Sequence, residues 1–90
     1  LEGARATPLA LVFSELLQNA LEHGGERVAI ELNHVGELAR LVISDDGDGI
    51  GNARHGTGLS IVEALVRNEL RGELLLHDMP GLRATVEFPL

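Results

Sequence analysis

The segment "SDDGDGIGNARHGTGLS", residues 44–60, gathers three aspartates and five glycines between two strongly patterned stretches of the chain. Such a composition indicates a metal or nucleotide site rather than a linker, because the segment lies inside one small core. A calcium loop of the EF-hand type is disfavoured, because Thr57 stands where that loop needs a bidentate glutamate. The G-x-G-x-x-G and Walker phosphate loops are absent, and the chain has no lysine.

Asp45 is the first acid of this segment and follows a predicted strand, on the same side as Leu41 and Ile43. A carboxylate that faces a core is costly unless a donor bonds it, and the amino group of adenine is such a donor. Gly47 and Gly49 would let the backbone approach a flat ring closely. The start of the segment is therefore predicted to hold a base.

Phosphate chemistry is predicted at the other end, where Gly56 and Gly58 precede a helix whose free N–H groups and dipole favour anions. Metal chemistry is predicted on the first helix, where Glu15, Asn19 and His23 follow one another at intervals of four residues. This spacing gives a polar stripe along one edge of the apolar face. An asparagine oxygen suits Mg²⁺, and a nearby glutamate can polarise a nucleophile.

Two helices and two hairpins are needed to position these residues. Thr7 is predicted to cap the first helix, with Pro8 at its first position and Gly24-Gly25 after its end. Apolar residues recur at helical spacing up to residue 23 and again over 59–70. They alternate over 28–32, 38–44, 74–76 and 84–88, and a turn is predicted over 33–37. The order predicts an α+β two-layer sandwich, with both helices on one face of a mixed, mostly antiparallel sheet.

The composition limits the class of protein. Ninety residues with 44% apolar content make one small domain with a core. The net charge of −7 and the lack of a basic cluster argue against nucleic-acid binding. There is no cysteine for a disulfide or a thiolate zinc site, and no apolar run long enough to span a membrane. We therefore expect no direct membrane contact by this domain.

Three motifs carry a family resemblance. "ELLQNALEHG", "DDGDGI" and "GTGLSIV" occur in that order and resemble the N box and the two glycine boxes of the GHKL ATPases. In particular, nearly the whole chain resembles the ATP-binding catalytic domain of two-component sensor histidine kinases. The resemblance implies a Bergerat fold, with ATP between the two helices beneath a lid. It also implies that residues 1–90 are a single cytoplasmic domain and a fragment of a longer sensor kinase, which can be membrane-anchored.

The resemblance also implies roles for individual residues. Asn19 would ligate Mg²⁺ beside the ATP phosphates, and Glu15 would assist phosphoryl transfer and could be a further metal ligand. Asp45 would accept a hydrogen bond from the adenine amino group. The other implied nucleotide-binding residues are His23, Gly47, Gly49, Gly56, Thr57, Gly58 and Leu59.

Three departures from the family pattern stand out. Glu22 occupies a position where many members carry lysine; Arg54 or His55 could substitute, although an exposed lid residue is the favoured interpretation. Leu82 follows Gly81, where the family often has threonine. Only "IGNARH" separates the glycine boxes, without the usual aromatic box, so either the lid is short or the sequence lacks part of it.

The implied function is to bind Mg-ATP and donate the γ-phosphate to a histidine on a separate dimerisation domain of the same full-length protein. A response regulator would receive the phosphoryl group indirectly. These 90 residues contain no phosphoacceptor helix, so alone they are not expected to autophosphorylate. An anti-sigma-factor serine kinase and a non-catalytic module that binds a nucleotide or a protein remain as alternatives.

Overall fold

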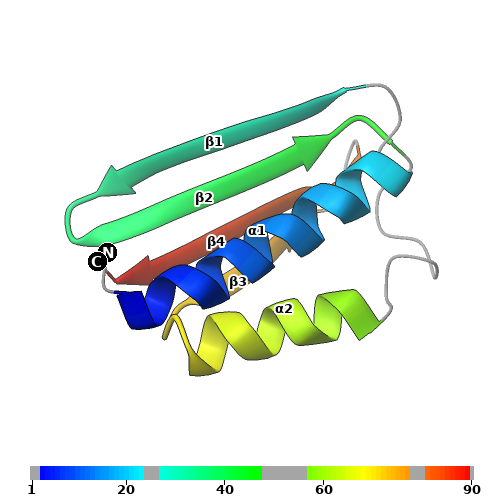
Figure 1. The fold of residues 1–90 in the computed structure, drawn as a ribbon. Helices are drawn as coiled ribbons and strands as arrows, with labels where there is room; N and C mark the ends of the chain where they lie inside the picture. Colours follow the sequence, from blue (N-terminus) through cyan, green and yellow to red (C-terminus); the bar gives the residue numbers. More distant parts are fainter. Residues whose placement is uncertain (1–2, 24–26, 48–56, 78–80, 90) are drawn as a thin grey trace.

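Two helices and four strands form the chain, in the predicted order of helix, hairpin, helix and hairpin (Figure 1). The structure is a computed structural model that describes residues 3–23, 27–47, 57–77 and 81–89. None of the helices it describes is both long and apolar enough to cross a membrane. The elements are α1 (Gly3–His23), β1 (Val28–Val35), β2 (Leu38–Asp45), α2 (Thr57–Asn68), β3 (Glu73–His77) and β4 (Arg83–Pro89).

The four strands form one sheet in the order β1-β2-β4-β3, so β4 lies inside the sheet between β2 and β3. The three pairings among the described strands are all antiparallel. Both helices cover the same face of the sheet, as Figure 1 shows. The predicted two-layer α+β sandwich is therefore confirmed, and the part of the predicted mixed sheet that is described is antiparallel throughout.

The core lies between the helices and the sheet. Apolar residues at helical spacing face alternate residues of the two inner strands, which is the pattern that buries one side of each element. Phe88 is the one aromatic side chain among the fully buried residues that the structure describes. The buried cluster consists of Val12, Leu16, Ala20, Val62 and Val66 from the helices, Leu70 just after α2, and Ala39, Leu41, Ile43, Ala84, Val86 and Phe88 from the strands.

The start of α1 differs from the prediction. The helix begins at Gly3 rather than after Thr7, so Thr7 is not its N-cap and Pro8 lies inside it. Proline in a helix removes the backbone bond that its own N–H would make to the residue four positions earlier. Only the bond to Ala4 is lost here, close to the free end of the helix. Ala4 and Ala6 have high helix propensity, so the helix begins before Pro8, at Gly3.

Two other boundaries also differ from the prediction. The turn predicted over 33–37 is shorter, because β1 continues to Val35 and only Gly36 and Glu37 separate it from β2. Gly36 has a φ of 61°, a conformation that glycine adopts without strain. The second helix covers Thr57–Asn68 rather than 59–70. Pairing with β2, which local patterns do not reveal, extends β1 from the predicted 28–32 to Val35.

Candidate functional site

Four elements meet at one end of the molecule. β2 and α1 end there, and α2 and β4 begin there, as Figure 1 shows. The end of β2 carries Asp45, and the last turns of α1 carry Asn19. The start of α2 carries Thr57 and Gly58. The fold therefore brings the base-binding, metal-binding and phosphate-binding segments predicted from the sequence to the same end of the domain.

Asp45 is half-buried, and its carboxylate is held by two backbone donors. The N–H of Gly47 donates to Oδ1 at 2.9 Å, and the N–H of Leu82 donates to the same oxygen at 3.4 Å. The N–H of Asp45 in turn donates to the carbonyl of Leu82 at 2.9 Å. A carboxylate offers about four acceptor sites, and these two backbone donors hold one of its oxygens in a fixed orientation.

The structure adds backbone donors to the sequence argument for Asp45. Leu41 and Ile43 are buried on the helix side of β2, and the alternation of a strand places Asp45 on that side, as predicted. The sequence argument also named the amino group of adenine as a possible donor to this carboxylate. The protein itself supplies two, from residues two and 37 positions away along the chain. A side chain that accepts from the N–H two residues later is a local Asx turn.

Gly81 lets the start of β4 approach the end of β2. Its φ is 81°, and a Cβ at this position would overlap the carbonyl oxygen of Asp45 and lie 3.1 Å from the Cα of Asp46. A larger residue would therefore push the two strand ends apart and move Leu82 away from the Asp45 carboxylate. The sequence analysis mentioned Gly81 only as the residue before Leu82, and its close contact with Asp45 is a structural constraint that the sequence reasoning missed.

Asp46, the acid next to Asp45, is bonded to the backbone in front of β1. Its side chain is exposed, but Oδ1 accepts a hydrogen bond from the N–H of Arg27 at 2.9 Å. The N–H of Asp46 donates back to the carbonyl of Arg27 at 3.3 Å. Asp46 thus ties the start of β1 to the end of β2, next to Asp45. Its role in this geometry is structural.

Glu15 and Asn19 are both half-buried on α1. They lie next to the buried face that contains Leu16 and Ala20, so their side chains border the core without entering it. Residues four apart are neighbours on a helix, so the two polar groups lie on one flank. Hard oxygen donors of this kind fit Mg²⁺, which usually takes only one or two protein ligands and completes its shell with water and phosphate. Within the described ranges, no group of three or more acidic or histidine side chains could hold a metal by itself.

Glu22 and His23 lie in the last turn of α1. Glu22, which stands where many family members carry lysine, is exposed, and its Oε1 accepts a hydrogen bond from Nε2 of Gln18 at 3.0 Å. It is therefore engaged within its own helix. The side chain of His23 lies outside the part of the chain that the structure describes, so its predicted contact with phosphate stays a prediction.

The start of α2 has the features of an anion site. Thr57 and Gly58 are its first residues, and its first turn contains no acidic residue. The first N–H groups of a helix lack intrahelical partners and carry the positive end of the helix dipole. Leu59 is half-buried and packs against the core, so its side chain helps to hold the start of α2 in place. The predictions for Gly49 and Gly56, and for Arg54 and His55, lie outside the described residues.

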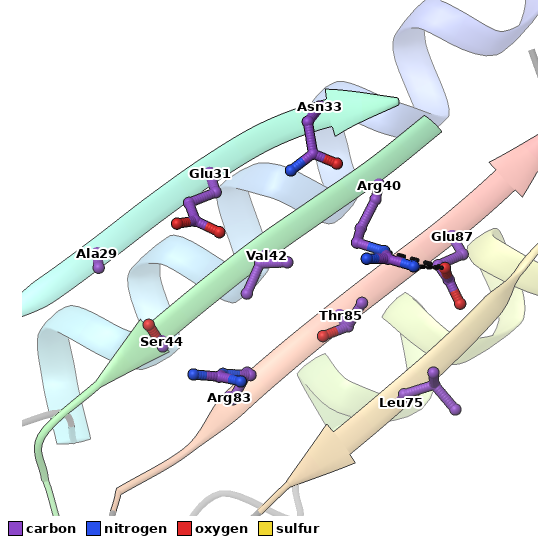
Figure 2. A pocket seen from close by; sticks show the side chains of 10 residues that line it. All are labelled: Ala29, Glu31, Asn33, Arg40, Val42, Ser44, Leu75, Arg83, Thr85 and Glu87. Atoms are coloured by element: carbon purple, nitrogen blue, oxygen red, sulfur yellow. Dashed lines mark hydrogen bonds and ion pairs between the residues drawn. The ribbon is translucent and has the colours of Figure 1, made fainter. Parts of the chain in front are cut away.

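An open hollow of about 330 Å³ lies on the opposite face of the sheet, which no described helix covers (Figure 2). It is lined by outward-facing strand residues and includes none of the site residues predicted from the sequence. Arg40 crosses it to Glu87, with Nε at 3.0 Å and Nη2 at 2.7 Å from the same carboxylate oxygen. This hollow therefore lies on the face of the sheet opposite the helices, apart from the residues predicted to bind the nucleotide.

Comparison with known proteins links this geometry to a family. The model of the family described as histidine kinase-, DNA gyrase B-, and HSP90-like ATPase matches residues 4–90. The sensor histidine kinase PdtaS of Mycolicibacterium smegmatis is 36% identical over 92 residues, which cover 90% of this chain and 18% of that protein. PdtaS of Mycobacterium tuberculosis is 36% identical over 89 residues, with 87% and 18% covered. The chain thus spans less than a fifth of these curated relatives.

Solved structures agree with the fold. The histidine kinase domain of the blue-light activated histidine kinase EL346 from Erythrobacter litoralis superposes with a TM-score of 0.83 at 30% identity. That match covers 97% of this chain and 48% of the other. The mycobacterial sensor histidine kinase MprB superposes with a TM-score of 0.79 at 27% identity, covering 92% and 70%. The two-layer arrangement described above is therefore the one found in histidine kinase domains.

Proposed function

Because the chain belongs to the family of histidine kinase-, DNA gyrase B-, and HSP90-like ATPases, we propose that it binds Mg-ATP where β2 ends and α2 begins. As part of a longer protein, it would present the γ-phosphate to a histidine of a separate phosphoacceptor domain. One observation carries this proposal: the Asp45 carboxylate is oriented by two backbone N–H groups at the end of the molecule where a helix start without acids is also found.

Asp45 is the proposed receptor for adenine. Its Oδ1 is fixed by Gly47 and Leu82 before any ligand arrives, so little reorganisation is needed on binding. The exocyclic amino group of adenine donates a hydrogen bond, whereas guanine carries an acceptor oxygen at the same ring position. A carboxylate therefore favours ATP over GTP. Gly47 and Gly49 would leave space for the flat ring beside the strand end.

The phosphates are proposed to lie at the start of α2. The N–H groups of the first residues there have no intrahelical partners, and the dipole favours negative charge. The sequence of this start, Gly56 to Leu59, supplies four consecutive N–H groups. Because the first turn has no acidic residue, no side chain there repels the phosphates. His23 is proposed to add a donor from the end of α1.

Asn19 is the proposed Mg²⁺ ligand, and Glu15 is the proposed base. Mg²⁺, when bound, would offset negative charge on the phosphate oxygens and help them align. In the transfer, a ring nitrogen of the acceptor histidine forms a bond to the γ-phosphorus while the bond to the β–γ bridging oxygen breaks, and ADP leaves. Glu15, on the same helix flank as Asn19, would accept the proton that the other ring nitrogen of the imidazole releases as the new bond forms.

The nature of the acceptor distinguishes this proposal from the alternatives. Full-length protein incubated with ATP labelled in the γ-phosphate is expected to carry label that acid removes and alkali leaves in place, as for a phosphohistidine. Acid-stable label on a serine of a partner protein would instead support an anti-sigma-factor kinase. Binding of ATP without any transfer by the full-length protein would support a non-catalytic module. Absence of binding at millimolar ATP with Mg²⁺ would contradict the proposal altogether.

A further inference from the structure

Leu82 is bonded to Asp45 through both its carbonyl and its N–H. Ser44 pairs with Arg83, so the next residues along the two strands, Asp45 and Leu82, lie opposite each other. The N–H of Asp45 donates to the carbonyl of Leu82 at 2.9 Å, and the N–H of Leu82 donates to Oδ1 of Asp45 at 3.4 Å. These two bonds fix the backbone of Leu82 directly beside the proposed adenine receptor.

The side chain of Leu82 is buried but lies outside the main core. It is 4% exposed, and of the buried apolar residues that the structure describes, it alone is not part of the cluster between the helices and the sheet. Ala84 and Val86 are buried on the helix side of β4, and the alternation of the strand places Leu82 on that side too. Asp45 lies on the same side of β2. Directly opposed residues have Cβ atoms about 4.5–5.5 Å apart, so the leucine side chain adjoins the Asp45 carboxylate.

The polar residues next to this pair in the sequence, Ser44 and Arg83, point to the other face of the sheet. Both line the hollow on the face that no described helix covers (Figure 2). On the helix side, the neighbouring pair of β2 and β4 is Ile43 with Ala84, and both residues are buried. Among the described residues of these two strand ends, the helix side therefore offers a base carbon atoms and the Asp45 carboxylate, but no hydroxyl or guanidinium group.

The backbone donors around the carboxylate are already used within the fold. The N–H groups of Gly47 and Leu82 donate to Oδ1 of Asp45. The N–H of Asp45 donates to the carbonyl of Leu82, and the N–H of Asp46 donates to the carbonyl of Arg27. A backbone N–H is a single donor, so none of these groups is available to a ring nitrogen of a base.

We propose that this site binds the exocyclic amino group of the base but makes no direct hydrogen bond to its ring nitrogens, and that Leu82 sets this selectivity. The inference rests on the proposed function, because it concerns the base that Asp45 would bind. Asp45 accepts the hydrogen bond from the amino group, and the Leu82 side chain contacts the adjoining part of the ring through carbon atoms. The substrate class is a nucleoside triphosphate whose base carries this amino group, whether nitrogen or C–H flanks it.

A ring nitrogen that faces Leu82 loses its bound water without gaining a donor. Burying an acceptor in this way is unfavourable, whereas a C–H group at the same position carries no such cost. Deaza analogues of ATP, in which one of the ring nitrogens flanking the amino group is replaced by C–H, should therefore bind at least as tightly as ATP. ITP carries a carbonyl oxygen in place of the amino group. It should bind at least about tenfold more weakly, because two acceptors then face each other.

Calorimetric titration of the wild-type chain with ATP, ITP and the two deaza analogues, in the presence of Mg²⁺, tests the inference. We expect both analogues to bind as ATP does, within about threefold, or more tightly, and ITP to bind at least about tenfold more weakly. A loss of about tenfold for either deaza analogue, with ITP also weak, overturns the inference but leaves the adenine site at Asp45 in place. Equal binding of ATP and ITP, or no binding of any of them, contradicts the proposed function as well.

Leu82→Thr tests the role of the leucine, because it places a hydroxyl donor next to Asp45. A neutral hydrogen bond changes a dissociation constant by about two- to tenfold, so this variant should prefer ATP to one of the deaza analogues by that factor. Leu82→Met keeps an apolar side chain and should bind all the nucleotides in the wild-type order. Val42→Thr is the matched control, since Val42 is half-buried on the opposite face of β2. A folded Leu82→Thr chain that keeps the wild-type order, with folding checked by thermal unfolding, would overturn the role of Leu82.

Discussion

Gly81 lies against the carbonyl oxygen of Asp45 so closely that a side chain at position 81 would overlap it. This contact joins the start of β4 to the end of β2, and it allows the N–H of Leu82 to reach the Asp45 carboxylate at 3.4 Å. The orientation of Asp45, the proposed adenine receptor, therefore requires glycine at position 81.

Gly81→Ala is expected to weaken ATP binding about tenfold, equivalent to about 1.4 kcal/mol, by moving Leu82 away from Asp45. Gly36→Ala is the matched control. Gly36 also has a positive φ, but a Cβ there would meet nothing within 4 Å, and the residue lies in the turn that connects β1 to β2. Each substitution should cost about 1–2 kcal/mol of stability because of its backbone conformation. Equal ATP affinity in the two variants, measured by calorimetry, would contradict the role of Gly81.

Asp46→Ala is expected to lower the free energy of unfolding by about 1 kcal/mol, because the N–H of Arg27 loses its acceptor. Asp46→Asn keeps an acceptor oxygen and should lose less. Urea denaturation of the two variants measures the difference. A loss in Asp46→Asn as large as in Asp46→Ala would mean that the negative charge, rather than the hydrogen bond to Arg27, stabilises this corner.

The helices, the strands and the hydrogen bonds of Asp45 and Asp46 show what the sequence could and could not predict. The buried face of α2 and the alternation in β4 follow directly from apolar spacing, and both were predicted. The predicted start of α1 was wrong. Pro8 is a strong local signal for a helix start, but the alanines before it favour helix and the helix begins at Gly3. The bonds of Asp46 to Arg27 and of Asp45 to Leu82 join residues 19 and 37 positions apart, so they depend on tertiary pairing that no local pattern contains.

Asn19→Ala is expected to weaken ATP binding about tenfold in the presence of Mg²⁺ and to have little effect without it, because Asn19 is proposed to act through the metal. Gln18→Ala is the control, since Gln18 is exposed on the same helix and bonds only to Glu22 among the described residues. Titration of labelled ATP with Mg²⁺ and with a chelator measures both. A loss of equal size under the two conditions would indicate a role other than metal binding.

Glu15→Gln is expected to slow phosphoryl transfer in the full-length protein about a hundredfold while leaving the ATP dissociation constant nearly unchanged. The matched control is Glu22→Gln, about two helical turns further along α1, where the carboxylate is exposed and bonded to Gln18. Single-turnover transfer from labelled ATP measures the rate. Should both variants transfer at the wild-type rate, Glu15 would be an ordinary helix-surface acid.

The central claim is that the end of β2 recognises adenine through Asp45 and not through its acidic neighbour. Its most direct test is the dissociation constant of Mg-ATP for the wild-type chain, Asp45→Asn and Asp46→Asn, measured side by side by calorimetry. A hydrogen bond to a charged group is worth about 1.5–3 kcal/mol, so Asp45→Asn should weaken binding by about 10- to 100-fold, while Asp46→Asn should bind like the wild type. Equal affinity of all three proteins for ATP would contradict the placement of the nucleotide.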